Sequence, residues 1–263
     1  MNGRAITSLS NPTVKAVRAL HLRKARDETG LFVAEGLKTV TEGVELGHAL
    51  RVLLFGREAA DHPLLRKAAQ ATLARGGEVI EVTQEILAKV SRRDNPQAVV
   101  GVFEQVFRPL DAIVPEAAPA WVALHRVRDP GNLGTIVRTA DAAGCGGVIL
   151  VGECCDPYSV EAVRATMGSI FAVPLSRASE AEFAGWRGAW PGSVVGALLS
   201  AEVDYRAADY RRPTLLLMGN EQQGLPPEMA SLCDVNVKIP MRGRADSLNL
   251  AVATGVMIYA AST

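Results

Sequence analysis

The feature that most constrains this chain is a series of short apolar segments that alternate with helix-like patterns. In the second half, several of these segments are apolar without interruption, which is typical of strands that are covered on both faces. Such an alternation predicts an α/β fold built around a parallel sheet. The strands are expected at residues 121–124, 148–151, 171–174, 194–198, 214–218 and 235–239.

The first half repeats the alternation in a separate block, which also predicts a parallel or mostly parallel sheet. Strands are expected at residues 31–34, 52–55, 79–82 and 98–103, and helices at residues 37–46, 63–73 and 84–90, after a first helix that begins at Asn11-Pro12. Residues 109–119 are rich in Pro and Ala and interrupt this rhythm. We therefore expect a first domain over residues 1–108, a linker over residues 109–119 and a second domain over residues 120–263.

Composition narrows the class of protein. Hydrophobic residues make up 48% and charged residues 21% of the chain, which is ordinary for an α/β protein. No apolar run reaches the roughly 18 residues of a membrane helix, and the polar, basic N-terminus lacks the apolar core of an export signal. The four cysteines show no metal-ligand spacing, so we expect reduced thiols, a cytoplasmic protein and no metal site.

Charge is distributed unevenly although the net charge is zero. Residues 1–26, here called the basic leader, contain several Lys and Arg residues and no acidic residue. A basic segment on a neutral protein favours local contact with phosphate groups, and a solvated helix face is the alternative. The candidates for phosphate contact are Lys15, Arg18, Arg23, Lys24, Arg92, Arg93, Arg242 and Arg244.

Three loops in the second half each lie between an expected strand and an expected helix, which is where ligands bind in open α/β sheets. In the first loop, Asn132 is expected to cap a helix that starts at Leu133, and Arg138 lies beside the buried stripe of that helix. A surface pair of Arg138 with Asp141 is the alternative to a functional role. The loop lacks the GxGxxG spacing, which argues against a dinucleotide-binding enzyme.

The other two loops add polar groups to the same expected crevice. Gly219 at a strand end permits close approach of a ligand to the backbone, and Glu221 is expected to project into the crevice. In the third loop, Asp246-Ser247 are expected to cap the last helix, with Asn249 in its first turn facing the crevice. This helix is apolar all round, so we expect one side to cover the sheet and the other to contact a second subunit in a homodimer.

Together, the three loops resemble the ribose 2′-O-methyltransferases of the SpoU/TrmH branch of the SPOUT superfamily. The matching segments are residues 129–134 (DPGNLG), 138–140 (RTA), 219–221 (GNE), 224–225 (GL), 239–241 (IPM) and 247–249 (SLN). Residues 162–175 resemble the family's connecting segment, with Thr166 where a serine is more usual. In the first half, residues 32–36 (FVAEG) resemble the family's RNA substrate-binding domain, which is similar in fold to ribosomal protein L30e.

The resemblance implies an S-adenosylmethionine-dependent enzyme that methylates a ribose 2′-hydroxyl of RNA, with ribosomal RNA favoured over tRNA. It implies an L30e-like α/β domain followed by a SPOUT α/β domain, whose parallel sheet carries a deep C-terminal trefoil knot. The family's functional positions fall on Asn132, Arg138, Glu221, Ser247 and Asn249. Its S-adenosylmethionine-binding positions fall on Leu199, Gly219, Ile239 and Leu248.

The chemistry implied by this resemblance requires either a base or groups that stabilise a developing alkoxide, because a 2′-hydroxyl is a poor nucleophile. The family's usual account makes the arginine at position 138 the base, but a guanidinium stays protonated in proteins. We therefore expect Arg138 to grip the adjacent phosphate, and Glu221 to orient the site or accept the proton. A non-catalytic RNA-binding protein of the same fold and a Rossmann-type nucleotide enzyme are the rival interpretations.

Overall fold

The computed structural model describes residues 4–262, which form two compact units. The first unit comprises the residues up to Gln105 together with Tyr158–Phe171, and the second comprises Val106–Pro157 and Ala172–Thr263. Residues 1–3 of the basic leader lie outside the described residues. The predicted division around residues 109–119 does not include the return of Tyr158–Phe171 to the first unit.

The first unit contains a five-stranded mixed sheet in the order β1-β4-β3-β5-β2. Its strands are β1 (Arg4–Ile6), β2 (Leu31–Glu35), β3 (Leu50–Gly56), β4 (Glu78–Val82) and β5 (Val99–Glu104). β5 runs antiparallel to both of its neighbours, so the prediction of a mostly parallel sheet is wrong for these pairings. β5 therefore begins at the end of the sheet where β3 and β4 finish, and the irregular residues 92–98 precede it.

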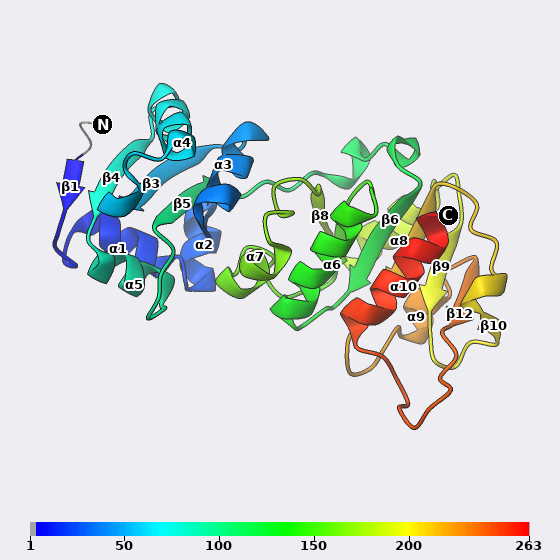
Figure 1. The fold of residues 1–263 in the computed structure, drawn as a ribbon. Helices are drawn as coiled ribbons and strands as arrows, with labels where there is room; N and C mark the ends of the chain where they lie inside the picture. Colours follow the sequence, from blue (N-terminus) through cyan, green and yellow to red (C-terminus); the bar gives the residue numbers. More distant parts are fainter. Residues whose placement is uncertain (1–3, 263) are drawn as a thin grey trace. The chain divides into compact units, whose positions relative to one another are not determined.

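The helices of the first unit are α1 (Pro12–Ala19), α2 (Arg23–Thr29), α3 (Leu37–Glu45), α4 (Pro63–Ala74), α5 (Gln84–Ser91) and α7 (Val160–Thr166). α1 and α5 both have side-chain caps at their N-termini: Thr13 N–H donates to the Asn11 side chain, and Ile86 N–H donates to the Thr83 hydroxyl. α1 and α5 lie side by side on one face of the sheet (Figure 1). Val14 and Ile86 belong to the buried apolar cluster beneath these two helices.

The second unit contains a seven-stranded sheet in the order β10-β12-β9-β11-β6-β7-β8, and every pairing in it is parallel, which confirms the predicted parallel sheet. Its strands are β6 (Ala120–His125), β7 (Val148–Val151), β8 (Leu175–Ala178), β9 (Val194–Ala197), β10 (Val203–Asp204), β11 (Thr214–Met218) and β12 (Val235–Lys238). The strand predicted at residues 171–174 is wrong, because Phe171 packs in the first unit and Pro174 has no N–H for a ladder.

Two layers of helices cover this sheet. They are α6 (Pro130–Ala142), α8 (Glu180–Arg187), α9 (Pro227–Ala230) and α10 (Leu250–Ser262). α10 packs against α6, as Figure 1 shows, and it also contacts β6 and β11. Phe183 of α8 and Met229 of α9 are buried in an apolar cluster with Trp121 and Leu215 of the sheet.

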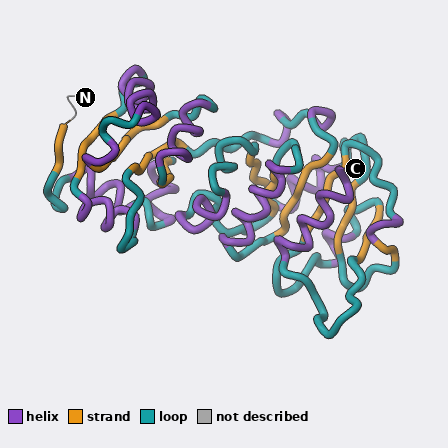
Figure 2. Tube along the Cα trace, viewed as in Figure 1, coloured by secondary structure: helices purple, strands orange, loops and turns teal. Residues whose placement is uncertain are grey.

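The strand order determines which loops are neighbours. β12, β9, β11 and β6 are adjacent and parallel, so the loops that follow them emerge together at one edge of the sheet. The loop between β12 and α10 projects from the second unit as the tip drawn in teal in Figure 2. Within residues 4–262, no helix is long and apolar enough to cross a membrane.

Candidate functional site

A chain of hydrogen bonds joins the three loops at the carboxyl edge of the parallel sheet. The Asn132 side chain, in the first turn of α6, donates to Glu221 Oε1 over 3.1 Å. Asn249, which immediately precedes α10, donates from Nδ2 to Asn132 Oδ1 over 2.9 Å. Three residues that the sequence places far apart therefore meet in one polar cluster.

Glu221 is held by backbone groups as well. Its two carboxylate oxygens accept hydrogen bonds of 3.1 Å from the backbone N–H groups of Arg128 and Asp129. Burial acts to raise the pKa of Glu221, but hydrogen bonds from Asn132 and from backbone N–H groups outweigh it, so the pKa lies below its ordinary value. Glu221 is thus a fixed anion that fastens the first loop to the second.

The helix caps around this cluster differ from the predicted ones. α6 is capped by Asp129, whose side chain accepts from Asn132 N–H over 2.6 Å, so the expectation that Asn132 is the cap is wrong. α10 begins later than predicted, and the Asn249 side chain, not Asp246-Ser247, accepts from Ala251 N–H over 2.9 Å. Asp before Pro at the first helical position is a known start signal that identifies Asp129.

A cavity of about 460 Å³ lies beside the cluster, between the loops that follow β9, β11 and β12. All four residues expected to bind S-adenosylmethionine line it, and so do Glu221 and Ser247. Apolar side chains such as Met218 and Leu225 share the lining with polar groups. Its lining therefore has the mixed character of small-molecule sites, which commonly measure about 300–1,000 Å³. The four expected residues are Leu199, Gly219, Ile239 and Leu248.

Gly219 is required by the loop itself. A Cβ at this position would lie 2.0 Å from the carbonyl carbon of Gly224, far inside van der Waals contact. Asn220 and Gly224 exchange backbone hydrogen bonds of 3.1 Å, and the Asn220 side chain accepts from Gln222 and Gln223 N–H groups. The close approach predicted for a ligand is thus made here by the chain's own backbone, which shapes this wall of the cavity.

Arg138 and Ser247 lie outside the hydrogen-bonded cluster. Arg138 is exposed on α6 and forms no hydrogen bond or ion pair with any residue that the structure describes; the alternative pairing with Asp141 is also absent between these two described residues. The Ser247 hydroxyl lines the cavity and lies 3.4 Å from Asp246 Oδ1, a long separation for such a contact. The structure brings together Asn132, Glu221 and Asn249 but does not place Arg138 with them.

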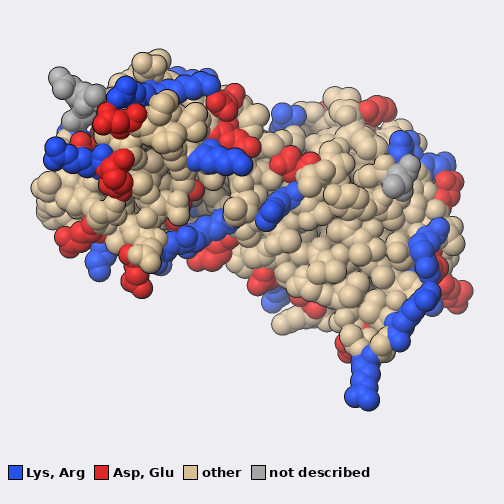
Figure 3. All heavy atoms as spheres, in the orientation of Figure 1, with Lys and Arg blue, Asp and Glu red and all other residues tan. Residues whose placement is uncertain are grey.

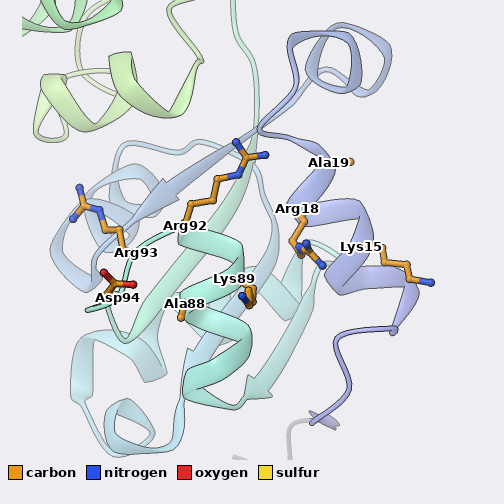
Figure 4. Close-up of a pocket in the computed structure, with 8 residues that line it drawn as sticks. All are labelled: Lys15, Arg18, Ala19, Ala88, Lys89, Arg92, Arg93 and Asp94. Atoms are coloured by element: carbon orange, nitrogen blue, oxygen red, sulfur yellow. The ribbon is translucent and has the colours of Figure 1, made fainter.

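A second hollow, of about 530 Å³, lies on the first unit between α1 and the end of α5. Figure 4 shows its lining side chains, which we call the basic basin: Lys15, Arg18, Lys89, Arg92 and Arg93, with Ala19, Ala88 and Asp94. Sequence reasoning missed Lys89, although its spacing from Arg92 and Arg93 at the end of one helix could have indicated it. Four of the eight candidate phosphate contacts gather here.

The other four candidate phosphate contacts lie elsewhere. On α2, Arg23 and Lys24 face Asp27 and Glu28 at 3.5 and 3.8 Å, in exposed pairs one helical turn apart. Arg242 and Arg244 are exposed in the loop between β12 and α10, where Figure 3 shows basic side chains on the projecting tip. Among residues 4–262, no three His, Cys, Asp or Glu side chains are grouped so that they could hold a metal ion.

Comparisons with known proteins bear on both units. The SpoU rRNA methylase family model matches residues 119–259, and the MRM3-like substrate binding domain model matches residues 11–101. The chain is 34% identical to the 23S rRNA (uridine(2479)-2′-O)-methyltransferase of Streptomyces viridochromogenes, over 91% of this chain and 85% of that protein. It is 28% identical to the 23S rRNA (guanosine(2553)-2′-O)-methyltransferase RlmP of Bacillus subtilis, over 97% of each.

A solved structure is similar over nearly the whole chain. The AdoMet-bound rRNA methyltransferase from Sinorhizobium meliloti superposes with a TM-score of 0.92 and 52% sequence identity, covering 98% of this chain and 97% of that one. The second unit has the parallel sheet and the loop motifs that the resemblance implied, and the family model spans more than half of the sequence. The chain belongs to the SpoU rRNA methylase family.

Proposed function

We propose that this chain transfers a methyl group from S-adenosylmethionine to a ribose 2′-hydroxyl of ribosomal RNA. The observation that carries the proposal is the Glu221–Asn132–Asn249 cluster, which joins three loops beside a cavity lined by all four expected cofactor residues. The two relatives methylate, by name, the ribose of a uridine and of a guanosine. What they share is the sugar oxygen, so we assign the ribose and leave the base open.

The cavity fits S-adenosylmethionine in size and in the character of its walls. Gly219, Ile239 and Leu248 would contribute backbone groups and apolar surface from the loops after β11 and β12, and Leu199 would close the side formed after β9. The rRNA methyltransferase from Sinorhizobium meliloti, which is 52% identical to this chain, is described as AdoMet-bound. When bound, S-adenosylmethionine supplies an electrophilic methyl group.

Glu221 acts in this mechanism by orienting the site. Its oxygens already accept hydrogen bonds from three N–H donors, and its lowered pKa makes it a weak base. The carboxylate holds Asn132, and Asn249 fixes the other end of the Asn132 amide. A polar edge with a fixed geometry can align a ribose with the methyl donor, and such alignment supplies a large part of the rate in a displacement reaction.

Arg138 is assigned the phosphate next to the target ribose. Its guanidinium is exposed, stays charged and has no carboxylate partner among residues 4–262. A guanidinium bound to that phosphate would stabilise negative charge on the nearby 2′-oxygen as its proton leaves to solvent. Ser247 and Asn249, at the cavity edge and at the start of α10, would hold the nucleotide beside the methyl donor.

We assign RNA binding to the first unit. The basic basin offers five cationic side chains around one hollow, with Asp94 as the acidic residue in its lining. Lys15, Arg18 and Arg92 form no ion pair within the described part of the chain, so they are available to phosphates. On the second unit, Arg242 and Arg244 are exposed and would bind phosphates as well. We also propose that the first unit is L30e-like, as the resemblance implies.

Two further properties belong to this proposal. We assign the C-terminal half a deep trefoil knot, supported by membership of the SpoU family. We assign a homodimer through α10, because Val252 and Tyr259 on its outer side are both 54% exposed and the surface over α6 and α10 is largely uncharged (Figure 3). Sedimentation should then show a dimer that the pair of changes Val252→Glu and Tyr259→Glu converts to a monomer. We also expect the protein to act in the cytoplasm, where its proposed substrate, ribosomal RNA, is located.

The function is tested by methyl transfer with purified components. Protein, S-adenosylmethionine carrying a labelled methyl group and unmodified ribosomal RNA are incubated, and the RNA is then hydrolysed in alkali. A 2′-O-methyl group blocks cleavage of the adjacent phosphodiester, so the label should appear in alkali-resistant dinucleotides. Label in mononucleotides would indicate base methylation and contradict the proposal. Label in tRNA alone would favour a tRNA methyltransferase. RNA binding without methyl transfer would favour a non-catalytic RNA-binding protein.

A further inference from the structure

The cavity assigned to S-adenosylmethionine has a one-sided charge. Its lining contains two carboxylates, Glu221 and Asp246, and no Lys, Arg or His among the residues that the structure describes there. Two negative charges at a partly enclosed site favour a cationic ligand over a neutral one of the same shape, because screening by water is reduced. The lining therefore favours a ligand with a positive charge.

The two carboxylates are not equivalent. Glu221 is engaged by the N–H groups of Arg128, Asp129 and Asn132. Asp246 is exposed, and the Ser247 hydroxyl approaches its Oδ1 no closer than 3.4 Å. It forms no ion pair with any residue between 4 and 262. Asp246 is therefore the carboxylate that is available to a bound cation.

Basic residues of the same loop do not cancel this charge inside the cavity. Arg242 and Arg244 precede Asp246 by a few residues, but neither lines the cavity. Arg242 instead acts electrostatically on Asp204, where it helps the Arg206 hydrogen bonds to lower the pKa of that carboxyl to about 2. The charge that Asp246 presents to the cavity is therefore not matched by a basic lining residue.

The proposed reaction changes the charge of the molecule in this cavity. The ribose oxygen forms a bond to the methyl carbon, the carbon–sulfur bond breaks with its electron pair staying on sulfur, and the hydroxyl proton leaves to solvent. The donor carries a sulfonium, an ammonium and a carboxylate, for a net charge of +1, whereas the thioether product is neutral. A negatively charged lining therefore attracts the methyl donor more strongly than the neutral product.

We propose that Asp246 is a specificity-determining residue that selects the cationic methyl donor over its neutral thioether product, S-adenosylhomocysteine. This inference rests on the proposed function. Its consequence is that the product loses the electrostatic attraction as soon as it forms, which favours exchange of the spent product for a fresh donor. The charge of Asp246, more than its shape, should carry the effect.

The test is calorimetric measurement of both dissociation constants on the full-length protein. Asp246→Asn, which is nearly isosteric, should weaken binding of S-adenosylmethionine about 3- to 10-fold and binding of S-adenosylhomocysteine less than about 2-fold. Asp246→Glu should preserve the wild-type ratio of the two constants. Asp209→Asn serves as the matched control, because Asp209 is an exposed carboxylate of the same unit that does not line the cavity. Asp246→Ser provides a second neutral variant should Asp246→Asn be poorly folded.

The possible results distinguish a failure of this inference from a failure of the proposed function. If both neutral variants weaken the two ligands equally, or leave the ratio unchanged, Asp246 does not read charge and this inference is overturned while the proposed function stands. If the selectivity lost in Asp246→Asn is also lost in wild-type protein as salt is raised, the electrostatic origin is supported. Wild-type protein that binds neither ligand contradicts the proposed function, and this inference with it.

Discussion

Asn249, at the start of α10, donates a hydrogen bond of 2.9 Å to the side-chain oxygen of Asn132, in the first turn of α6. The Asn249 oxygen meanwhile accepts from Ala251 N–H and caps α10. One side chain thus begins the last helix and ties it to the first loop, so capping and site assembly are combined at a single residue.

These two roles of Asn249 can be separated by substitution. Serine caps helices about as well as asparagine but is too short to reach Asn132, so Asn249→Ser should keep the wild-type melting temperature and lose about 10-fold or more in methyl transfer. Asn249→Ala should lose the same activity and about 1 kcal/mol of stability as well. Thermal unfolding and single-turnover transfer measure the two effects. Full activity in Asn249→Ser would show that the bond to Asn132 is dispensable.

Glu221 should contribute to stability in a pH-dependent manner. Its pKa is lowered in the folded state by hydrogen bonds that outweigh its burial, so its stabilising effect is present above the unfolded-state pKa and is lost as pH falls through the lower folded-state value. The difference in free energy of unfolding between wild type and Glu221→Gln should therefore be largest at neutral pH and shrink below about pH 4. Denaturant titrations at pH 7, 5 and 3.5 measure it. A difference that grows with acidity would mean that the carboxyl is stabilised in its protonated form.

The role of Arg138 is tested by its charge dependence. If it binds phosphate and stays protonated, Arg138→Lys should retain part of the turnover across the whole pH range, and Arg138→Ala should lose about 100-fold or more at every pH. Single-turnover rates between pH 6 and 10 distinguish the two models. Rescue by lysine only near the pKa of lysine itself would instead favour base chemistry.

The basic basin should dominate the salt dependence of RNA binding. Arg18→Gln with Arg92→Gln should reduce the slope of log affinity against log salt by about 0.7–0.9 for each lost phosphate contact. Arg23→Gln with Lys24→Gln is the matched pair, because these cations already face carboxylates on α2, and it should reduce the slope less. Filter binding at a series of salt concentrations checks both. Equal slopes for the two double variants would remove the basin from the interface.

The thiols should be inert in the folded protein. Burial raises the pKa of Cys155 to about 12, with the nearby carboxylates of Glu221 and Asp129 adding to the shift, and burial also raises that of Cys233 to about 12. Because the thiolate is the reactive form, alkylation by iodoacetamide at pH 8 should be about a thousandfold slower at these positions than in unfolded chain. Mass spectrometry with and without denaturant measures the ratio. Rapid labelling of Cys155 in native protein would show that the packing beside Glu221 opens.

The sequence predicted the parallel sheet of the second unit because several of its strands are apolar without interruption, as strands that are covered on both faces should be. It failed at residues 171–174, just before β8, because an apolar run such as the one that contains Phe171 and Val173 does not reveal which unit it packs into. The antiparallel β5 was missed for a related reason: its direction depends on an irregular connection, not on the pattern within the strand.

At the candidate site, the sequence indicated residue types but not their hydrogen bonds. Asn132, Glu221 and Asn249 were identified through motifs, yet only the fold shows that Asn132 bridges the other two. The backbone N–H groups of Arg128 and Asp129 leave no signature in side-chain patterns. Lys89 was overlooked because a lone lysine on a helix is ordinary until the basin around it is seen.

The most direct measurement of the central claim is a map of 2′-O-methylation in total RNA from cells with and without this protein. The account predicts one or a few ribose methyl groups in ribosomal RNA that disappear without the protein, return with the wild-type chain and stay absent with Asn132→Ala. Unchanged ribose methylation, or restoration by a variant that lacks the Asn132 amide, would contradict it.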